Sequence, residues 1–167
     1  MITEAYRQLQ AQKHALGSYG VSGHLYADIV ANMATNAGTT DVLDYGCGQR
    51  TLEKALGFLI RNYDPSIPEF SESPTHQADI VVCTDVLEHI EPEYIDSVLD
   101  DLQRLTRKIG FFVIATDAAN KTLADGRNAH LIQEQPEWWL PKIMARWELK
   151  QYQRRKRCFD CLVRPKC

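Results

Sequence analysis

Short apolar runs alternate with amphipathic helical segments along this 167-residue chain, and this alternation constrains its fold more than any other feature. In segment 93–108 the apolar residues repeat every three or four positions, which predicts a helix that Gly110 stops. The uninterrupted apolar runs 80–83 and 111–115 flank it. Runs without polar alternation are typical of parallel strands that helices cover on both faces. The order of strand, helix and strand therefore predicts a doubly wound α/β layer.

Segments before this core predict further elements of the same kind. Thr3 is placed to cap a first helix, and the glycine-rich segment 17–23 ends it before a second helix at 25–33. Apolar runs at 41–45 and 58–63 predict two strands, which a brief helix joins.

The chain changes character after the core. A long polar connection at 116–136 has the length of a lid or binding loop. It leads to a helix at 139–147. Trp138 and Trp139, at its start, have the spacing of core residues and, alternatively, could stack on a bound ring. Extended stretches at 149–153 and 159–163 predict a terminal antiparallel hairpin.

Composition excludes several classes of protein. The apolar fraction of 44% and the charged fraction of 25% are those of a globular domain, and the net charge of −3 provides no general attraction for nucleic acid. No apolar run approaches a membrane span, and the N-terminus lacks a signal-peptide core, so we expect a cytoplasmic protein without a membrane partner. The odd number of cysteines indicates free thiols, and Cys158, Cys161 and Cys167 fall short of the four ligands of a structural zinc site.

Polar and glycine residues gather where the predicted parallel strands end. Gly46 and Gly48 follow the first strand, which also carries Asp44; Asp64 closes the second, and Thr84-Asp85 closes the third. Ligands of such sheets bind beyond the carboxyl ends of the strands. The twenty residues from Asp44 to Asp64 suit a carboxylate that accepts both hydroxyls of a ribose.

The ligand predicted here carries a ribose and a cation but no pyrophosphate. Thr51 occupies the position of the third glycine in the dinucleotide fingerprint, and Asp44 would bring negative charge close to a pyrophosphate. S-adenosylmethionine has an α-ammonium, a sulfonium and a ribose, and so it fits this pattern.

Two strings carry a family resemblance over residues 40–165. Val42-Leu43-Asp44-Tyr45-Gly46-Cys47-Gly48 and the stretch 79–90, which contains Asp85-Val86-Leu87-Glu88-His89, resemble motifs of the class I S-adenosylmethionine-dependent methyltransferases. The compact middle of the chain is similar to short, phage-encoded members of that family. The resemblance implies a Rossmann-like, mostly parallel sheet in one domain, 1–167, with a helical cover at 1–38 and a cofactor-binding core at 40–165.

The resemblance also assigns roles to the residues at the strand ends. Asp44 would meet the methionine part of the cofactor, while Gly46 and Gly48 would let the loop wrap it. Asp64 would bind the ribose hydroxyls, and Thr84 and Asp85 would line the pocket near the sulfonium.

Two departures from the family pattern stand out. Arg50 occupies a position that is usually a small residue, and only fourteen residues separate Asp64 from Asp79, where relatives fit a helix and another strand. We therefore expect that additional strand to be shortened or absent. The residue that binds adenine is not assigned.

The expected reaction is an in-line methyl transfer to an oxygen or nitrogen of a small molecule. His89, after the third strand's end, and His130, in the polar connection, are the candidate catalytic bases. A helix-start histidine that bonds backbone is the alternative for His89. No metal ligand is assigned, and the oligomeric state is left open.

Two other functions stay open. Asp85-x-x-Glu88-His89 with His130 resembles the metal site of small-RNA 3′-terminal 2′-O-methyltransferases, and the cations at 154–157 could contact phosphates. A nucleic-acid methyltransferase acting on an RNA 2′-oxygen or a base, with or without a metal, is thus one alternative. A module that binds the cofactor without catalysis is the other.

Overall fold

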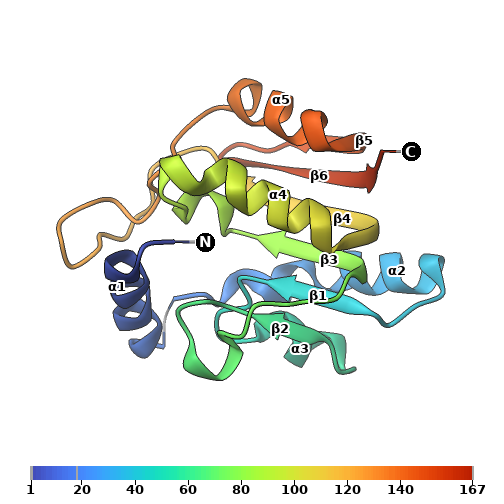
Figure 1. Ribbon diagram of the computed structural model, residues 1–167, viewed down its shortest axis with the longest axis horizontal. Helices are drawn as coiled ribbons and strands as arrows, with labels where there is room; N and C mark the ends of the chain where they lie inside the picture. Colours follow the sequence, from blue (N-terminus) through green and yellow to red (C-terminus); the bar gives the residue numbers. More distant parts are fainter. Residues whose placement is uncertain (1, 18, 167) are drawn as a thin grey trace.

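A computed structural model describes residues 2–17 and 19–166 of the chain (Figure 1). Its strands are β1 (Val42–Tyr45), β2 (Arg61–Tyr63), β3 (Ala78–Thr84), β4 (Thr106–Ala115), β5 (Trp147–Arg154) and β6 (Cys158–Pro165). Its α-helices are α1 (Glu4–Ala15), α2 (Ala27–Ala37), α3 (Thr51–Leu56), α4 (Ile95–Leu105) and α5 (Pro136–Arg146). Short 3₁₀ turns cover Ser22–Tyr26, Pro68–Phe70, Leu87–His89 and Pro92–Tyr94.

The strands form one sheet in the order β2-β1-β3-β4-β6-β5. β1 to β4 pair in parallel, whereas β6 is antiparallel to both β4 and β5. The predicted Rossmann-like sheet with its terminal hairpin is therefore confirmed. Because β2 and β3 lie on opposite sides of β1, the strand order reverses there, and a crevice opens beyond the carboxyl ends of β1 and β3.

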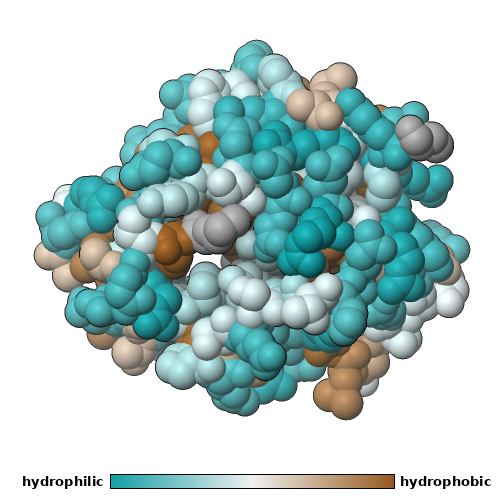
Figure 2. Space-filling model, in the orientation of Figure 1, coloured by the Kyte–Doolittle hydropathy of each residue, from teal (hydrophilic) through white to brown (hydrophobic). Residues whose placement is uncertain are grey.

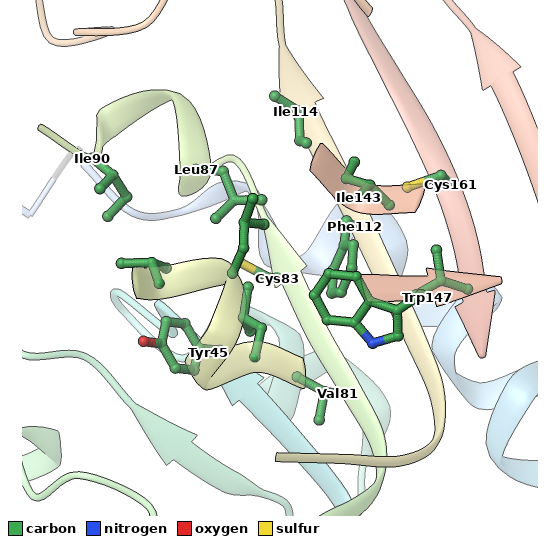
Figure 3. Close-up of a cluster of buried hydrophobic side chains, with 14 of the residues drawn as sticks. Tyr45, Val81, Cys83, Leu87, Ile90, Phe112, Ile114, Ile143, Trp147 and Cys161 are labelled. Atoms are coloured by element: carbon green, nitrogen blue, oxygen red, sulfur yellow. The ribbon is translucent and has the colours of Figure 1, made fainter. Parts of the chain in front are cut away.

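Helices cover both faces of the sheet, and β3 shows why its run is wholly apolar. Val81 and Cys83 pack with α4 and α5 on one face, while Ile80 and Val82 pack with α2 and α3 on the other. Figure 3 shows part of the first cluster, where Phe112 lies against the ring of Trp147, with ring centroids 5.1 Å apart. Burial on two faces leaves no position of β3 for a polar side chain in its middle.

The predicted helix over 93–108, stopped by Gly110, is wrong at its C-terminal end. Helix α4 ends at Leu105, and Arg107 and Lys108 belong to β4, as does Gly110, which pairs with Val163. The two cations bind the carboxylate of Asp79 at 3.1 and 2.9 Å instead of following the helix dipole. The ion pairs with Asp79 of β3 therefore favour a strand at Arg107 and Lys108, although the local pattern of these residues is helical.

Other elements are shorter than the sequence indicates, or have shifted ends. The second helix, predicted at 25–33, starts as a 3₁₀ turn, and Leu25 in that turn is 66% exposed. β2 spans only Arg61–Tyr63, and Trp147 starts β5 instead of ending α5. Trp139 is fully buried, which supports its interpretation as a core residue.

The segment between β2 and β3 holds a single 3₁₀ turn and no strand, as expected from its length. Figure 1 shows α1 and the connection after β4 together at the end of the sheet where the parallel strands point. Tyr6 and Tyr19 from the N-terminal segment pack with Leu123 and Ala129 from that connection. Thr3 caps α1 as predicted, with its hydroxyl accepting a bond from the Tyr6 N–H.

The surface seen in Figure 2 is mostly hydrophilic, and its apolar areas are small and separate. None of the described helices has the length and apolar character that would let it span the hydrocarbon core of a membrane. Cys47, Cys83, Cys158 and Cys161 are free thiols, whereas Cys167 lies outside the described residues.

Candidate active site

A cavity of about 490 Å³ opens at the carboxyl ends of the parallel strands. Gly46 and Asp64 form its wall at β1 and β2, and Asp85 and His89 form it beyond β3. His130 comes from the polar connection. Five of the eight residues predicted for the site therefore line one cavity, although they come from distant parts of the sequence.

The remaining three predicted residues lie close by but do not line this cavity. Asp44 and Thr84 are 4% and 7% exposed, inside the sheet's end. Gly48 lines a second, more open cavity of about 420 Å³ together with residues of α1 and the 66–70 segment.

Gly46 and Gly48 occupy positions that a side chain would block. Both have positive φ, +84° and +49°, a region that favours glycine. A Cβ on Gly46 would lie 2.3 Å from Val86 Cγ2, and one on Gly48 would lie 2.5 Å from the carbonyl oxygen of Gly20. The glycine turn is thus closely covered by β3's end on one side and the N-terminal segment on the other.

Asp64 is held firmly and uses its two oxygens unequally. Oδ1 accepts bonds from the N–H and hydroxyl of Ser66, at 3.0 and 2.6 Å. Oδ2 accepts one bond, from the N–H of Gly48 at 3.2 Å, and lies 3.7 Å from Nε2 of His14. A carboxylate oxygen has two lone-pair sites, so Oδ2 keeps one acceptor site for a ligand.

Burial raises the pKa of Asp44 to about 7, and the nearby carboxylates of Asp64 and Glu53 act in the same direction. A cation close to these acids would stabilise the charged form of Asp44. The location therefore suits the positively charged part of a ligand.

Asp85 has a left-handed backbone with φ of 55° directly after β3. Such a conformation costs a non-glycine residue of order 1 kcal/mol and is found at functional sites. The N–H of Asp85 bonds to the carbonyl of Val113, which fixes the turn. Burial raises the pKa of the Asp85 carboxyl, while a bond from Ser22 lowers it.

His89 is oriented by backbone and by Tyr19. Its Nδ1 lies 2.6 Å from the carbonyl oxygen of Ala129 and 3.0 Å from the Tyr19 hydroxyl. Because a carbonyl only accepts, Nδ1 carries the proton and Nε2 keeps its lone pair. Burial lowers the pKa of His89 to about 3, with the neighbouring His130 adding to the effect.

His130 has the same arrangement as His89. Its Nδ1 lies 2.6 Å from the carbonyl oxygen of Asp117, so its Nε2 also keeps a lone pair. The two imidazole rings meet edge to face, with centroids 4.8 Å apart. The structure therefore brings together the two histidines that the sequence offered as separate candidates.

Glu88 has a buried carboxyl that lies beside the two histidines. The sequence indicated a role for Glu88 only in the metal alternative. Oε1 accepts the N–H of Ala115, whereas Oε2 is buried without a hydrogen-bond partner. Burial raises the pKa of Glu88 to about 8, and the charge of Asp85 adds to it. One ligand atom each from Glu88, His89 and His130 lie within 4.8 Å of one another, close enough to hold a metal ion after a small adjustment.

The N-terminal segment covers the cavity, and the sequence did not predict which of its residues line the site. Tyr6, His14 and Tyr19 all line it. The Tyr6 hydroxyl donates to the carbonyl of His89, and Thr3 donates twice to the carboxylate of Glu91. No short motif links these residues to the sheet, because their partners lie 50 to 88 positions away.

Arg50 and three of the four cations at 154–157 form ion pairs with acidic side chains of the protein. Arg50 binds Glu53 at 2.8 Å and stacks on Phe70, which turns it away from the larger cavity. At the hairpin tip the ion pairs are Arg154–Glu137, Arg155–Asp160 and Arg157–Asp117. These pairs reduce the charge that the tip could offer to phosphates.

A family model described as a methyltransferase domain matches residues 19–157, which is most of the chain. The chain belongs to the methyltransferase domain family. This membership confirms the prediction of a class I S-adenosylmethionine-dependent methyltransferase. None of the curated proteins matches the sequence significantly.

Solved structures share the fold of this methyltransferase domain. The DhpI–SAH complex has a TM-score of 0.64 and 16% identity, with 95% of each chain covered. A Burkholderia thailandensis 1,6-didemethyltoxoflavin-N1-methyltransferase with bound S-adenosylhomocysteine has a TM-score of 0.65 and 15% identity, covering 100% of this chain and 92% of that one. An Escherichia coli rRNA methylase has a TM-score of 0.57 and 14% identity, covering 99% and 78%. Because the neighbours include both classes of acceptor, the fold leaves the acceptor open.

Proposed function

We propose that this methyltransferase domain transfers the methyl group of S-adenosylmethionine to an oxygen or nitrogen of a small molecule. The observation that carries the proposal is the continuity of one cavity from Asp64, through Gly46 and Asp85, to His89 and His130. A cofactor could thus occupy the part nearest β1 and β2 while an acceptor contacts the two histidines.

The residues near β1 fit the chemistry of this cofactor. Oδ2 of Asp64 has an acceptor site for a ribose hydroxyl, and Gly46 leaves backbone open to a ligand. Asp44 and Asp85 supply negative charge where the ammonium and sulfonium would lie. When bound, S-adenosylmethionine supplies a methyl group on a sulfonium, so the leaving group needs no protonation.

The residues at the other end of the cavity act on the acceptor. Nε2 of His130 can accept a proton from an acceptor hydroxyl or ammonium, because its Nδ1–H is committed to a backbone carbonyl. His89, whose pKa is lowered to about 3, stays neutral, and its Nε2 can accept a hydrogen bond that orients the acceptor. Tyr19 and α1 cover part of the cavity, which would limit the access of water to the reacting groups and help to align the acceptor.

The roof and the size of the cavity favour a small acceptor. The cavity's 490 Å³ must hold both cofactor and acceptor, and α1 with the polar connection closes over it. The paired cations at the hairpin tip weaken the case for a polyanion.

The test is methyl transfer from radiolabelled S-adenosylmethionine to a panel of small hydroxyl and amine compounds. We expect transfer to one of them and a fall of about 10²- to 10⁴-fold in kcat for the His89→Gln, His130→Gln double variant. His76→Ala, which alters an exposed histidine, is the control and should be fully active. Cofactor binding with no transfer to any acceptor would instead support the non-catalytic module.

The orphan oxygen of Glu88 favours a second candidate function, metal-assisted transfer to a hydroxyl. A divalent cation held by Glu88, His89 and His130 would satisfy Oε2 and lower the pKa of a bound hydroxyl. Chelation should then abolish transfer, and a divalent cation should restore it. Transfer to an RNA 3′ end under those conditions would support the nucleic-acid alternative, whereas chelator-resistant transfer would exclude the metal.

We also propose separate roles for the two parts of the domain and a cytoplasmic location for the protein. Residues 1–38 would act as a cover that closes on the core at 40–165, since α1 contacts the core through side chains at the cavity. Free thiols at Cys47, Cys83 and Cys161 suit a reducing compartment such as the cytoplasm.

A further inference from the structure

Asp64 is the residue expected to bind both ribose hydroxyls, yet its hydrogen bonds leave room for only one. Oδ1 already accepts two bonds from Ser66, which fill its two lone-pair sites. Oδ2 accepts one bond from Gly48 and has a single site left. A second hydroxyl on the neighbouring carbon therefore needs a different partner.

His14 lies where that partner is needed. Its Nε2 is 3.7 Å from Oδ2 of Asp64, which is longer than a hydrogen bond, so the two atoms do not satisfy each other. The His14 side chain is 11% exposed and lines the cavity on the same side as Asp64. Two polar atoms at this separation can each take one of two adjacent hydroxyls.

The fold fixes the imidazole of His14 in this position. Gly20 has φ of +69°, and a Cβ there would lie 2.7 Å from Cε1 of His14, so only glycine leaves space for the ring. The Tyr19 ring packs edge to face at 5.0 Å, and Gln49 donates to the His14 carbonyl at 3.0 Å. The ring is therefore confined between Gly20 and Tyr19 while its backbone is held by Gln49, and a confined ring loses little conformational entropy when it binds a ligand.

We propose that His14 and Asp64 form a two-residue clamp for the ribose diol of the cofactor, each binding one hydroxyl. A hydroxyl both donates and accepts, so it can bond to Nε2 of His14 in either tautomer. The clamp rests on the proposed function and extends it, because it places a residue of the N-terminal cover in the cofactor site. Cofactor binding then fastens α1 onto the core.

The test measures binding of S-adenosylhomocysteine and of its 2′-deoxy and 3′-deoxy analogues by titration calorimetry. Wild type should bind both analogues more weakly than the parent compound. His14→Ala should weaken binding of the parent about three- to tenfold, and Asp64→Ala about tenfold or more, because its bond involves a charge. Each variant should become indifferent to the loss of a different hydroxyl.

Further variants separate a direct contact from a structural effect. His14→Gln retains a hydrogen-bonding group and should recover part of the affinity, with a Tm near that of wild type. His76→Ala should bind all three compounds as wild type does, because His76 is exposed and does not line the cavity. The double variant should lose less than the product of the single losses, since the two contacts hold one diol.

The outcomes distinguish the clamp from the function on which it rests. If wild type does not bind S-adenosylhomocysteine, both the proposed function and the clamp fail. If wild type binds it but His14→Ala and His14→Gln bind all three compounds unchanged, only the clamp fails. The clamp also fails if Asp64→Ala alone becomes indifferent to both hydroxyls.

Discussion

Asp44 shows how a residue that suits a bound cation can cost stability when the cation is absent. It lies buried beside Asp64 and Glu53, and its pKa rises from 3.8 to about 7. The folded protein thus binds this proton more tightly than the unfolded chain does. The unfolding free energy must therefore fall as pH rises between these two values.

Replacing this carboxyl by an amide removes that dependence. We expect Asp44→Asn to be more stable than wild type at pH 8 without cofactor, because wild type loses up to about 1.4 kcal/mol per pH unit between the two pKa values. Urea titrations from pH 4 to pH 8 check this. Asp28→Asn, at an exposed position, is the control and should follow wild type. Identical pH slopes for Asp44→Asn and wild type would contradict the prediction.

At the same scale, the sequence predicts most of the site from residues next to a strand end, and His130 in the polar connection is the exception. Asp64, Asp85 and His89 are recognisable because they follow apolar runs, and they all reach the cavity. His14 and Tyr19 carry no such signal, since the residues that they approach, Asp64 and His89, lie 50 and 70 positions away. Docking of that kind depends on tertiary packing and not on local spacing.

At the scale of elements, polar contacts at the start of α1 help to attach this helix to the core. Thr3 donates from its N–H and its hydroxyl to the two oxygens of Glu91, both at 2.8 Å. A glutamine at 91 keeps only one acceptor oxygen and has no charge. The attachment of the helix should therefore weaken while the sheet keeps its packing.

We expect Glu91→Gln to raise hydrogen exchange in residues 2–17 about tenfold, from the loss of a charge-assisted bond. Mass spectrometry of exchanged peptides measures this, and the strands β1, β3 and β4 should exchange as in wild type. Glu4→Gln, which alters an exposed pair with Arg7 on the same helix, serves as the control. An increase spread over the whole chain would indicate general destabilisation instead.

Helices and strands can be predicted from the sequence where burial determines their pattern of apolar residues. β3 is found correctly because helices cover both of its faces, and every residue in it is buried. The boundary after α4 is wrong because Lys108 and Arg107 look like the end of a helix, yet they bind Asp79 on the adjacent strand. Ion pairs across strands leave no trace in the local sequence.

At the scale of the whole molecule, the cavity joins three separate parts of the chain. Its walls are the strand ends, the N-terminal segment and the connection after β4, which packs on Tyr6 and Tyr19. A ligand that contacts all three should therefore stabilise the molecule as a unit.

We expect S-adenosylhomocysteine at 100 times its Kd to stabilise the fold by about 2.7 kcal/mol, which corresponds to a Tm increase of roughly 5–11 °C. Hydrogen exchange should slow both in residues 2–17 and in 117–131, with little change in the outer strand β5. Adenosine alone, which lacks the amino-acid part, should give a smaller shift in Tm. Protection confined to one wall of the cavity would show that the walls do not close together.

The two margins of the sheet have a further consequence for behaviour at high concentration. One margin is β2, with only three residues, and the other is β5, whose outer positions carry exposed charged and polar side chains, among them Glu148, Lys150 and Arg154. Very short or highly charged borders are poor templates for strand addition by another molecule. Crowded preparations of this protein should consequently resist fibre-like aggregation.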